Sequence, residues 1–486
     1  MPSTNFMTGI IVPNGFAVLG LATCVIGIAV VIFLRFFYID FPKIEGIPEI
    51  PNGDLLAGHL YQLDDDHATK SETWARTYGW PVFQLRMGRR RAIVLNSFEA
   101  AREWMVKNQT ATLDRPWFHT FHGVISATSA ATIGTSPWDE RTKKQRRVIG
   151  SFTTGPSIQK LRNMLDMETF RSTNSTTQDF IPHLRYFARN GRNETAIKVR
   201  ARRDQWLATA LNKVRDTVTL FSGDRKSVAA MLLTDNQEGL TPLDIKTILG
   251  GLMSGGFETV FSTAIITIGM LSTAEGQLIQ QKAYENIMSF YDTAEEAFEA
   301  CVSEEKCAYI CGLVKEALRF YPPLKLLPAR QTYKEFNYHG AEIPKGVLVY
   351  MNAQAINRDS TTYGADADQF RPERWVDKTY DVPPPYHFAF GAGARMCTAV
   401  NFSNRVLYAI FLRLIVSFNI TESKSMPADV HYINYKRDPS ASNAVASDFK
   451  VKFTPRSHES LEKCLGESQD NLADFMSKDS AEVLLR

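Results

Sequence analysis

The chain has 486 residues, of which 44% are hydrophobic and 22% are charged, an ordinary balance for a globular protein with a large core. Its net charge of +3 is too small to indicate binding to nucleic acid. Six cysteines in so long a chain do not make a disulfide framework, so a reducing compartment is expected.

The N-terminal segment is apolar. No charged side chain precedes Arg35, and Phe16–Leu34 is a mostly apolar run close to the ~20 residues that a helix needs to span a bilayer. A cleavable signal peptide would have a basic start and a shorter apolar core. Positive charge after the run, at Arg35 and Lys43, favours a cytosolic location for the rest of the chain. The sequence therefore predicts a single-pass anchor over 1–35 and a stiff, proline-containing linker over 36–52.

The remaining chain predicts one large domain over 53–456, followed by a polar, loosely ordered tail over 457–486. Residues 80–95 favour β-strands joined by a hairpin turn, and residues 336–352 favour strands again. Amphipathic helical patterns dominate between these two regions. The fold class predicted is mainly α, with a small β-sheet region at one side.

One stretch interrupts the helical pattern. The segment Leu165–Phe170 breaks off in mid-period, and the polar stretch 171–179 follows at once. The sequence therefore looks shortened near residue 170. Either the protein is a compact variant or its gene model is incomplete, and the abrupt break favours the second.

Two adjacent glycines lie inside a predicted helix that Thr241 and Asp244 open. Gly255 and Gly256 would each cost ~1 kcal/mol relative to Ala in that helix. They therefore need a reason. One is close packing against a neighbouring helix; the other is a functional opening of the helix.

A glycine-rich loop carries the clearest chemical signal. The segment Phe390–Ala399 places Cys397 ahead of an apolar helical run, two residues after Arg395. A thiolate there can serve as an axial ligand to haem iron, with Arg395 as a cation for a haem propionate. Gly393 supplies the backbone dihedral of a tight loop. The alternative is a buried structural cysteine at a helix start.

This loop resembles the haem-binding signature of the cytochrome P-450 superfamily, Phe-x-x-Gly-x-Arg-x-Cys-x-Gly, with Ala399 in place of the last glycine. The resemblance is strengthened by Glu316 and Arg319, which precede the loop in a helical pattern. Arg374, which lies in the sequence between Arg319 and the loop, strengthens it further. It implies the cytochrome P-450 fold preceded by one transmembrane helix. It also implies a haem b ligated by Cys397, next to Phe390, and a buried cluster of Glu316, Arg319 and Arg374.

The same resemblance assigns roles on both sides of the haem. Glu258 and Thr259 would deliver protons to bound O2, at the place where the double glycine opens the helix. Trp138, Arg330 and His387 would contact haem propionates. The family usually has an arginine four residues after the tryptophan, where this chain has Thr142. Either Arg141 or Gln145 could substitute for it, and Arg141 is the assignment that we make.

Electron supply follows from the resemblance too. Five basic residues stand close together after Trp138: Arg141, Lys143, Lys144, Arg146 and Arg147. They suggest a basic face for an acidic electron donor, an NADPH-dependent cytochrome P-450 reductase of the endoplasmic reticulum membrane. The alternative is an ordinary solvated helix face.

Three segments resemble a narrower group, the fungal membrane-bound hydroxylases of small aromatics: Thr132–Glu140, Ser254–Glu258 and Leu326–Arg330. That group includes phenylacetate hydroxylases and the m-cresol and m-hydroxybenzyl alcohol hydroxylases of patulin-type mycotoxin pathways. Trp117, Phe118 and Phe121 could line a small apolar pocket, or could instead touch the membrane surface.

The leading hypothesis is therefore an O2-dependent monooxygenase of secondary metabolism. The alternatives are a reductase-independent isomerase or lyase acting on a hydroperoxide, and a truncated gene product that holds no haem. The short interval between Trp138 and Thr259 motivates the last of these, because the family usually has several more helices there.

Overall fold

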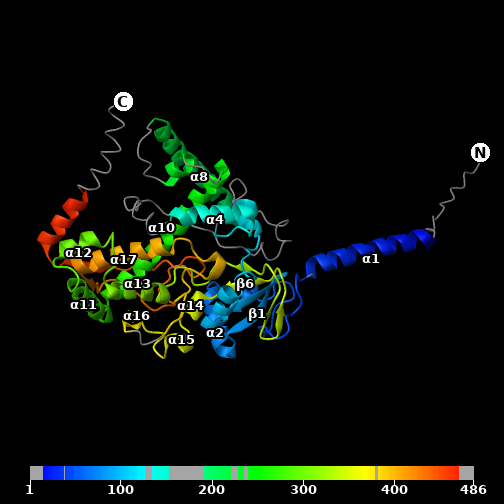
Figure 1. Cartoon of the computed structure of the whole chain (residues 1–486). Helices are drawn as coiled ribbons and strands as arrows, with labels where there is room; N and C mark the ends of the chain where they lie inside the picture. Colours follow the sequence, from blue (N-terminus) through cyan, green and yellow to red (C-terminus); the bar gives the residue numbers. More distant parts are fainter. Residues whose placement is uncertain are drawn as a thin grey trace, which may run out of the picture.

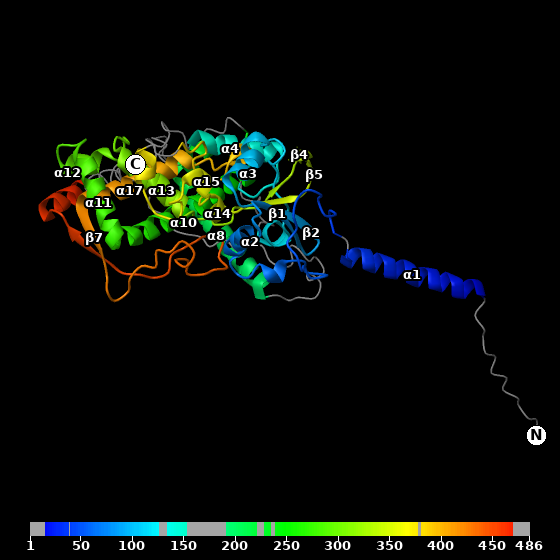
Figure 2. The ribbon, with the colours of Figure 1, turned by 90° about the horizontal axis from the view of Figure 1, so that it is seen from below.

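A computed structural model describes residues 15–37, 39–125, 134–152, 191–220, 228–234, 239–377 and 381–469. Figures 1 and 2 show a large body, helical for the most part, with a small sheet at one side, from which helix α1 projects away. The predicted class, mainly α with a small sheet region, is confirmed. The predicted shortening near residue 170 lies outside the described residues.

The helices of the first half are α1 (Gly15–Phe37), η1 (Leu60–Gln62), α2 (His67–Tyr78), α3 (Phe98–Arg102), η2 (Glu103–Lys107), η3 (His119–Ile125), α4 (Glu140–Phe152), α8 (Gly191–Leu220) and α9 (Val228–Thr234). Those of the second half are α10 (Pro242–Ser272), α11 (Ala274–Met288), α12 (Ala294–Ala300), α13 (Ala308–Phe320), α14 (Ala353–Ile356), α15 (Ser360–Tyr363), α16 (Glu373–Val376), η4 (Gly393–Arg395) and α17 (Val400–Ser417).

The main sheet has the order β1-β2-β6-β3. Strands β1 (Val82–Met87) and β2 (Arg90–Leu95) form the hairpin that the sequence predicted, with Met87 paired to Arg90. Strand β6 (Leu348–Met351) joins β2 in parallel and β3 (Arg330–Gln331) antiparallel. Two further pairs are β4 (Phe336–Tyr338) with β5 (Ala341–Ile343), and β7 (Phe418–Glu422) with β8 (Val451–Pro455).

The central helix α10 begins as the sequence predicted. The Thr241 hydroxyl accepts a hydrogen bond from the Asp244 backbone N–H, and the Asp244 carboxylate accepts one from the N–H of Thr241. This reciprocal capping box satisfies N–H groups that a helix start leaves without partners. Helix α10 then packs with α11, α13 and α17 around the largest hydrophobic core. Its N-terminal half joins α4, α8 and α9 in a smaller core.

Two segments at the predicted domain boundaries pack against the body. In the segment predicted as a stiff linker, Ile44, Ile47 and Ile50 are buried against the main sheet. The first part of the predicted tail is a helix over 458–469, in which Cys464 joins the largest core. Each segment places apolar residues where a neighbouring surface buries them.

Helix α1 has strongly exposed apolar side chains, among them Leu19, Leu21 and Ile26. Within the part of the chain that the structure describes, however, no helix meets both the length and the hydropathy required to cross a bilayer. The transmembrane anchor predicted for residues 1–35 is therefore not confirmed.

Candidate active site

The Cys397 loop is held by backbone geometry that only glycine allows. Gly391 and Gly393 have φ angles of 67° and 64°. A Cβ atom on Gly393 would stand 1.7 Å from the Met105 carbonyl oxygen, so no side chain can be accommodated there. The close contact between η2 and η4 that results fixes the loop against the body of the protein.

Hydrogen bonds then orient the cysteine itself. The Cys397 N–H donates to the Phe390 carbonyl over 2.9 Å, and the Ala399 N–H donates to the Cys397 sulfur over 3.4 Å. Burial raises the pKa of the thiol, while the Ala399 N–H and the nearby Arg146 cation lower it. The sulfur remains accessible at the start of α17. A bound cation would lower the pKa of the thiol further than the Ala399 N–H and Arg146 do, because a cation favours the thiolate.

Three buried arginines lie next to the loop. Arg395 donates to the Ser136 carbonyl over 2.8 Å, Arg330 to the Ala392 carbonyl over 2.9 Å, and Arg115 to the Ala329 carbonyl over 2.7 Å. The Trp138 ring lies 5.3 Å from the Arg395 guanidinium carbon, a cation–π distance. The structure thus brings together Trp138, Arg330 and Arg395 from the sequence prediction, and adds Arg115.

Their electrostatics are unusual. Burial, and then repulsion from Arg395 and Arg146, lower the pKa of Arg330 to about 9. Burial lowers the pKa of Arg115 well below its ordinary value, with Arg330, Arg395 and Arg146 as further causes. Among the described residues, no carboxylate forms an ion pair with Arg115, Arg146 or Arg330. A buried group of like charges is costly unless an anion neutralises it.

These residues fit a haem. The Nε atoms of Arg115 and Arg330 are buried without a hydrogen-bond partner in the described structure. A haem carries two propionates, for which arginines are suitable partners, and an iron, for which the Cys397 thiolate is a suitable axial ligand. The arginines and the thiol together therefore provide both halves of a haem-thiolate site. Cys397, Arg395, Arg330, Trp138 and Phe390 remain our assignments for it.

Helix α4 places its basic residues differently from the sequence expectation. Arg141 donates to the Asp244 carboxylate over 2.6 Å, and Gln145 donates to the same oxygen over 2.7 Å. Burial raises the pKa of Asp244, but hydrogen bonds from Thr241, Arg141 and Gln145 bring it well below its usual range. Arg141 therefore clamps α4 to the start of α10 and does not join the arginines beside Cys397.

Arg146 takes the place near the haem loop instead. Its guanidinium donates to the Met396 carbonyl over 2.7 Å, one residue before Cys397. The predicted basic face is also less open than expected, because Lys143 pairs with Glu140 and Lys144 donates to the Gly239 carbonyl. Sequence reasoning included Arg146 only as one of five cations. Arg115 was missed, since its sole cue is a lone charge beside buried Ala111 and Leu113.

His387 makes its hydrogen bond within its own segment and not with the arginines beside Cys397. It is buried, and its Nδ1 accepts from the Ala389 N–H over 3.3 Å. Burial, with Lys315 and Arg319 as neighbouring cations, lowers its pKa to about 3, so the imidazole is neutral. A neutral ring next to these cations is a poor partner for a propionate, and its role as one stays a prediction.

Glu258 and Thr259 stand within α10, which is unbroken from Pro242 to Ser272. The Thr259 hydroxyl donates to the Gly255 carbonyl over 2.7 Å, a side-chain bond to the carbonyl one turn earlier, and the local opening of the helix stays a prediction. Apart from their chain neighbours and the backbone of their own helix, no atom of the described residues lies within 4 Å of a Cβ placed on Gly255 or Gly256. Among the described residues, close packing against a neighbouring helix therefore does not explain the two glycines.

The aromatic segment before Trp138 is partly exposed. Trp117 is 52% exposed, whereas Phe118 packs partly against the sheet. The His122 Nδ1 accepts from the Phe118 N–H over 2.9 Å, and its Nε2 lies 3.1 Å from the Thr135 carbonyl oxygen. His122 is thus engaged with backbone groups of its own segment. Neither a pocket nor a membrane role for the segment is decided by these contacts.

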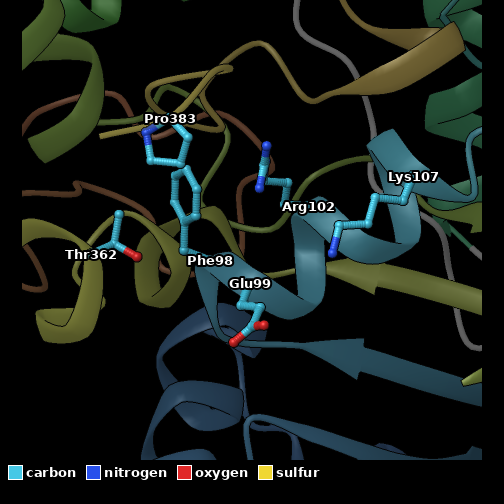
Figure 3. A pocket seen from close by; sticks show the side chains of 6 residues that line it. All are labelled: Phe98, Glu99, Arg102, Lys107, Thr362 and Pro383. Atoms are coloured by element: carbon cyan, nitrogen blue, oxygen red, sulfur yellow. The ribbon is translucent and has the colours of Figure 1, made fainter. Parts of the chain in front are cut away.

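A separate pocket of about 190 Å³ opens at the surface beside α3. Its lining consists of Phe98, Glu99, Arg102, Lys107, Thr362 and Pro383, which Figure 3 shows around the opening. None of the predicted site residues belongs to it. The pocket therefore does not describe the haem site.

The predicted structural cluster forms deep in the body. The Glu316 carboxylate binds Arg319 through two hydrogen bonds of 2.7 and 2.9 Å, and lies 3.7 Å from Arg374. All three side chains are fully buried. Asp366 pairs with Arg374 over 2.9 Å and Trp375 donates to Glu316, two contacts that the sequence did not indicate.

Comparison with known proteins matches residues 154–432 to the family model of cytochrome P450. A phenylacetate 2-hydroxylase of Emericella nidulans is 33% identical over 509 residues, covering 91% of this chain and 97% of the relative. A 3-hydroxyphenylacetate 6-hydroxylase of the same organism is 30% identical, covering 85% and 90%. A cytochrome P450 monooxygenase of Mycosarcoma maydis is 26% identical, covering 84% and 86%.

The first of these alignments also bears on the length of the chain. It extends over 509 residues, more than the 486 that this chain possesses, although it takes in only 91% of them. The relative therefore contains residues that have no counterpart here. The shortening near residue 170 stays a prediction.

Proposed function

This chain belongs to the cytochrome P450 family, and from that premise we propose that it is a monooxygenase that hydroxylates a small phenolic compound. The family and the relatives named as hydroxylases identify an oxidoreductase of the monooxygenase type. The finer proposal is a substrate of the m-cresol or m-hydroxybenzyl alcohol type, in a patulin-like secondary pathway of a fungus. The relatives that act on phenylacetate and 3-hydroxyphenylacetate, small aromatics, support it.

The observation that carries the chemistry is the pairing of an oriented cysteine with buried, unneutralised arginines. When bound, a haem supplies O2 activation, which the electron-rich thiolate favours. The chain's own part is to hold Cys397 in place through the Phe390 carbonyl and the Ala399 N–H. Arg115, Arg330 and Arg395 would hold the propionates, and the Thr259 hydroxyl would guide a proton on the opposite side.

We propose further that electrons come from NADPH through a cytochrome P450 reductase, with the chain attached to the endoplasmic reticulum membrane by α1. The exposed apolar side chains of α1 support attachment, since such surface is rarely left in water. Arg146 and Arg147 on α4 are candidates for contact with an acidic donor. The chain's catalytic body would then face the cytosol.

The decisive experiment measures haem content and turnover of the purified protein with reductase and NADPH. We expect stoichiometric haem and a hydroxylated product from m-cresol or m-hydroxybenzyl alcohol, with phenylacetate as a comparison substrate. Product from a lipid hydroperoxide without NADPH would instead identify an isomerase or lyase. Failure to hold haem, reversed when residues near 170 are restored from the transcript, would support an incomplete gene model.

Thr259→Ala separates the monooxygenase from the lyase. Because the hydroxyl is proposed to act only while O2 is being cleaved, NADPH oxidation should continue while reducing equivalents go to hydrogen peroxide. We expect the yield of hydroxylated product per NADPH to fall by roughly 100-fold or more, the lower end of the range that a positioned proton donor contributes. Ser262→Ala, one turn further along α10, is the matched control. An unchanged yield in Thr259→Ala would remove the proposed role.

A further inference from the structure

The surface pocket beside α3 is lined by two cations whose charge is not balanced by a nearby acid. Within the part of the chain that the structure describes, neither Arg102 nor Lys107 forms an ion pair, and the Arg102 Nε is buried without a hydrogen-bond partner. A buried polar atom without a partner is uncommon in a folded protein and needs a reason. An oxygen atom of a bound ligand would supply the missing acceptor.

A wide helical turn brings the two cations to one opening. Helix η2 is of the π type, and the Asn108 N–H donates to the Glu103 carbonyl five residues earlier, over 2.9 Å. Side chains five residues apart point in different directions on an α-helix, but they share a face in this wider turn. Arg102 and Lys107 are five residues apart, and Figure 3 shows both beside the same opening. Turns of this type are rare and are frequent at functional sites.

The other side of the pocket is apolar. Figure 3 shows the rings of Phe98 and Pro383 together, across the opening from the two cations. Tyr363 and Phe388 hold the Phe98 ring edge-on, at centroid distances of 5.8 and 5.2 Å. Phe98 is almost completely buried by these contacts, so the partly exposed Pro383 ring is the wall that a ligand meets beside it. A ligand that fits both sides has an apolar part and a negative charge.

The pocket walls are built without a ligand. The Asp359 carboxylate accepts from the Phe98 N–H over 2.8 Å and from the Thr361 N–H over 3.0 Å, which joins α3 to α15. A site that is already formed loses little conformational freedom on binding. Its volume of about 190 Å³ is below the ~300 Å³ at which sites for drug-sized ligands begin, so it suits a single ring and not a large cofactor.

We propose that this pocket binds a small aromatic carboxylic acid, at a site separate from the haem. The carboxylate is held by Arg102, whose planar guanidinium matches it, and by the Lys107 ammonium. The ring of the ligand lies along Pro383 and the edge of Phe98. Glu99, exposed at the rim, opposes an anion, but two cations against one carboxylate leave the lining positive. The site does not depend on the proposed hydroxylation.

The test counts the phenylacetate bound per chain, by equilibrium dialysis of the purified full-length protein. An azole in excess ligates the iron and excludes the acid from the haem cavity. We expect one phenylacetate per chain to remain bound, and the neutral amide, phenylacetamide, not to displace it. Its affinity should fall about 10-fold in Arg102→Gln, the effect of losing a charged hydrogen bond. Exposed Lys107→Gln should weaken it about 3-fold.

A charge change of the opposite sign sharpens the test. Glu99→Gln should strengthen the binding of phenylacetate, because it removes the one carboxylate from the lining. Lys424→Gln is the matched control for the two cations, since this lysine is exposed in another part of the molecule, and it should bind as the parent does.

Each outcome decides the proposal. Azole-resistant binding that Arg102→Gln weakens and Glu99→Gln strengthens supports it. No binding in the presence of the azole overturns it, as does binding that the pocket variants leave unchanged. Weaker binding in Glu99→Gln would identify a ligand with an ammonium group, and equal competition by phenylacetamide would show that the charge is not read. Either result overturns the proposal.

Two further results separate this site from the proposed function. Slower reduction by the reductase in Arg102→Gln, with no acid bound to the parent, would identify the electron donor as the occupant and overturn the proposal. A chain that hydroxylates no phenol, or that holds no haem, fails the proposed function only. The phenylacetate bound per chain, compared between the parent and the pocket variants, still decides the site in that case.

Discussion

Two groups of buried arginines in this molecule differ in what neutralises them. Arg319 and Arg374 lie in the core around Glu316, with Asp366 as a second carboxylate. Arg115 and Arg330 lie beside the Cys397 loop, where their guanidinium groups donate to carbonyl oxygens of the described residues, and where burial and then other arginines lower their pKa values. Both groups are buried. Charge balance, rather than burial, tells them apart.

The difference separates a structural role from a binding role. A cluster whose charges cancel within the chain stabilises the fold as soon as it forms. A cluster that contains only cations weakens the folded apoprotein and becomes favourable when an anion enters. The second arrangement is therefore indicative of a ligand, and the haem propionates match it in sign and number of charges. Substitutions in the two clusters should consequently differ in their effect on the stability of the protein without haem. A substitution in the balanced cluster should lower the free energy of unfolding, and one in the cation cluster should not.

The largest effect is expected at Glu316. Glu316→Gln keeps the shape of the side chain but leaves Arg319 without its carboxylate, and removing one partner of a buried pair costs ~3–5 kcal/mol. The free energy of unfolding in denaturant measures this loss. Glu140→Gln is the matched control, since its pair with Lys143 is exposed and should be worth at most ~0.5 kcal/mol. Equal losses in both variants would contradict a structural role for the cluster.

The next effect concerns the ligand itself. Cys397→Ser should abolish the absorption band near about 450 nm of the reduced CO complex, because only a thiolate donates enough charge to the iron. The fold should persist, since the Cys397 side chain is not part of a core. Cys311→Ser, at a partly buried thiol on α13, is the control and should keep the band. A band that survives in Cys397→Ser would show that another residue ligates the iron.

The contrast also shows what the sequence could predict. Glu316 and Arg319 are one helical turn apart, and the Phe390–Ala399 loop is continuous, so local spacing identified both. The β1–β2 hairpin and the capping box of α10 were predicted for the same reason. The positions of Arg115 and Arg146 beside the loop were not predicted. Arg115 approaches the loop from the segment after η2, and Arg146 approaches it from α4. Arg141 binds Asp244 at the start of another helix, a contact that the sequence does not reveal.

Arg115→Met tests the arginine group beside the Cys397 loop. The Arg115 side chain has no carboxylate partner among the described residues, and its neighbouring cations are Arg330, Arg395 and Arg146. Removing it relieves repulsion, so the apoprotein should unfold no more easily than the parent. Haem should dissociate faster by about 10-fold to 100-fold, the factor for one charged hydrogen bond of ~1.5–3 kcal/mol. Transfer of haem to apomyoglobin gives the rate, and Arg437→Met at the surface is the control. A destabilised apoprotein with an unchanged haem rate would place Arg115 with the structural cluster instead.

The smallest effect is the pH dependence that His387 contributes beside the paired cluster. Its pKa is about 3 in the fold, mainly through burial, compared with an ordinary value of 6.5. Between these values the unfolded chain binds a proton that the folded one does not, so stability is lost as the pH falls below 6.5. The expected slope is at most ~1.4 kcal/mol per pH unit.

His387→Asn tests this slope directly, because the asparagine oxygen can accept from the Ala389 N–H in place of Nδ1 while the side chain does not titrate. The free energy of unfolding, measured between about pH 7 and about pH 5, should therefore depend less steeply on pH in the variant. Lower stability at every pH is expected from the lost ring contacts, so only the slope is diagnostic. His458→Asn, on the exposed face of the C-terminal helix, should keep the parental slope. If His387→Asn keeps it as well, the imidazole is already protonated in the fold and its proposed burial in neutral form is wrong.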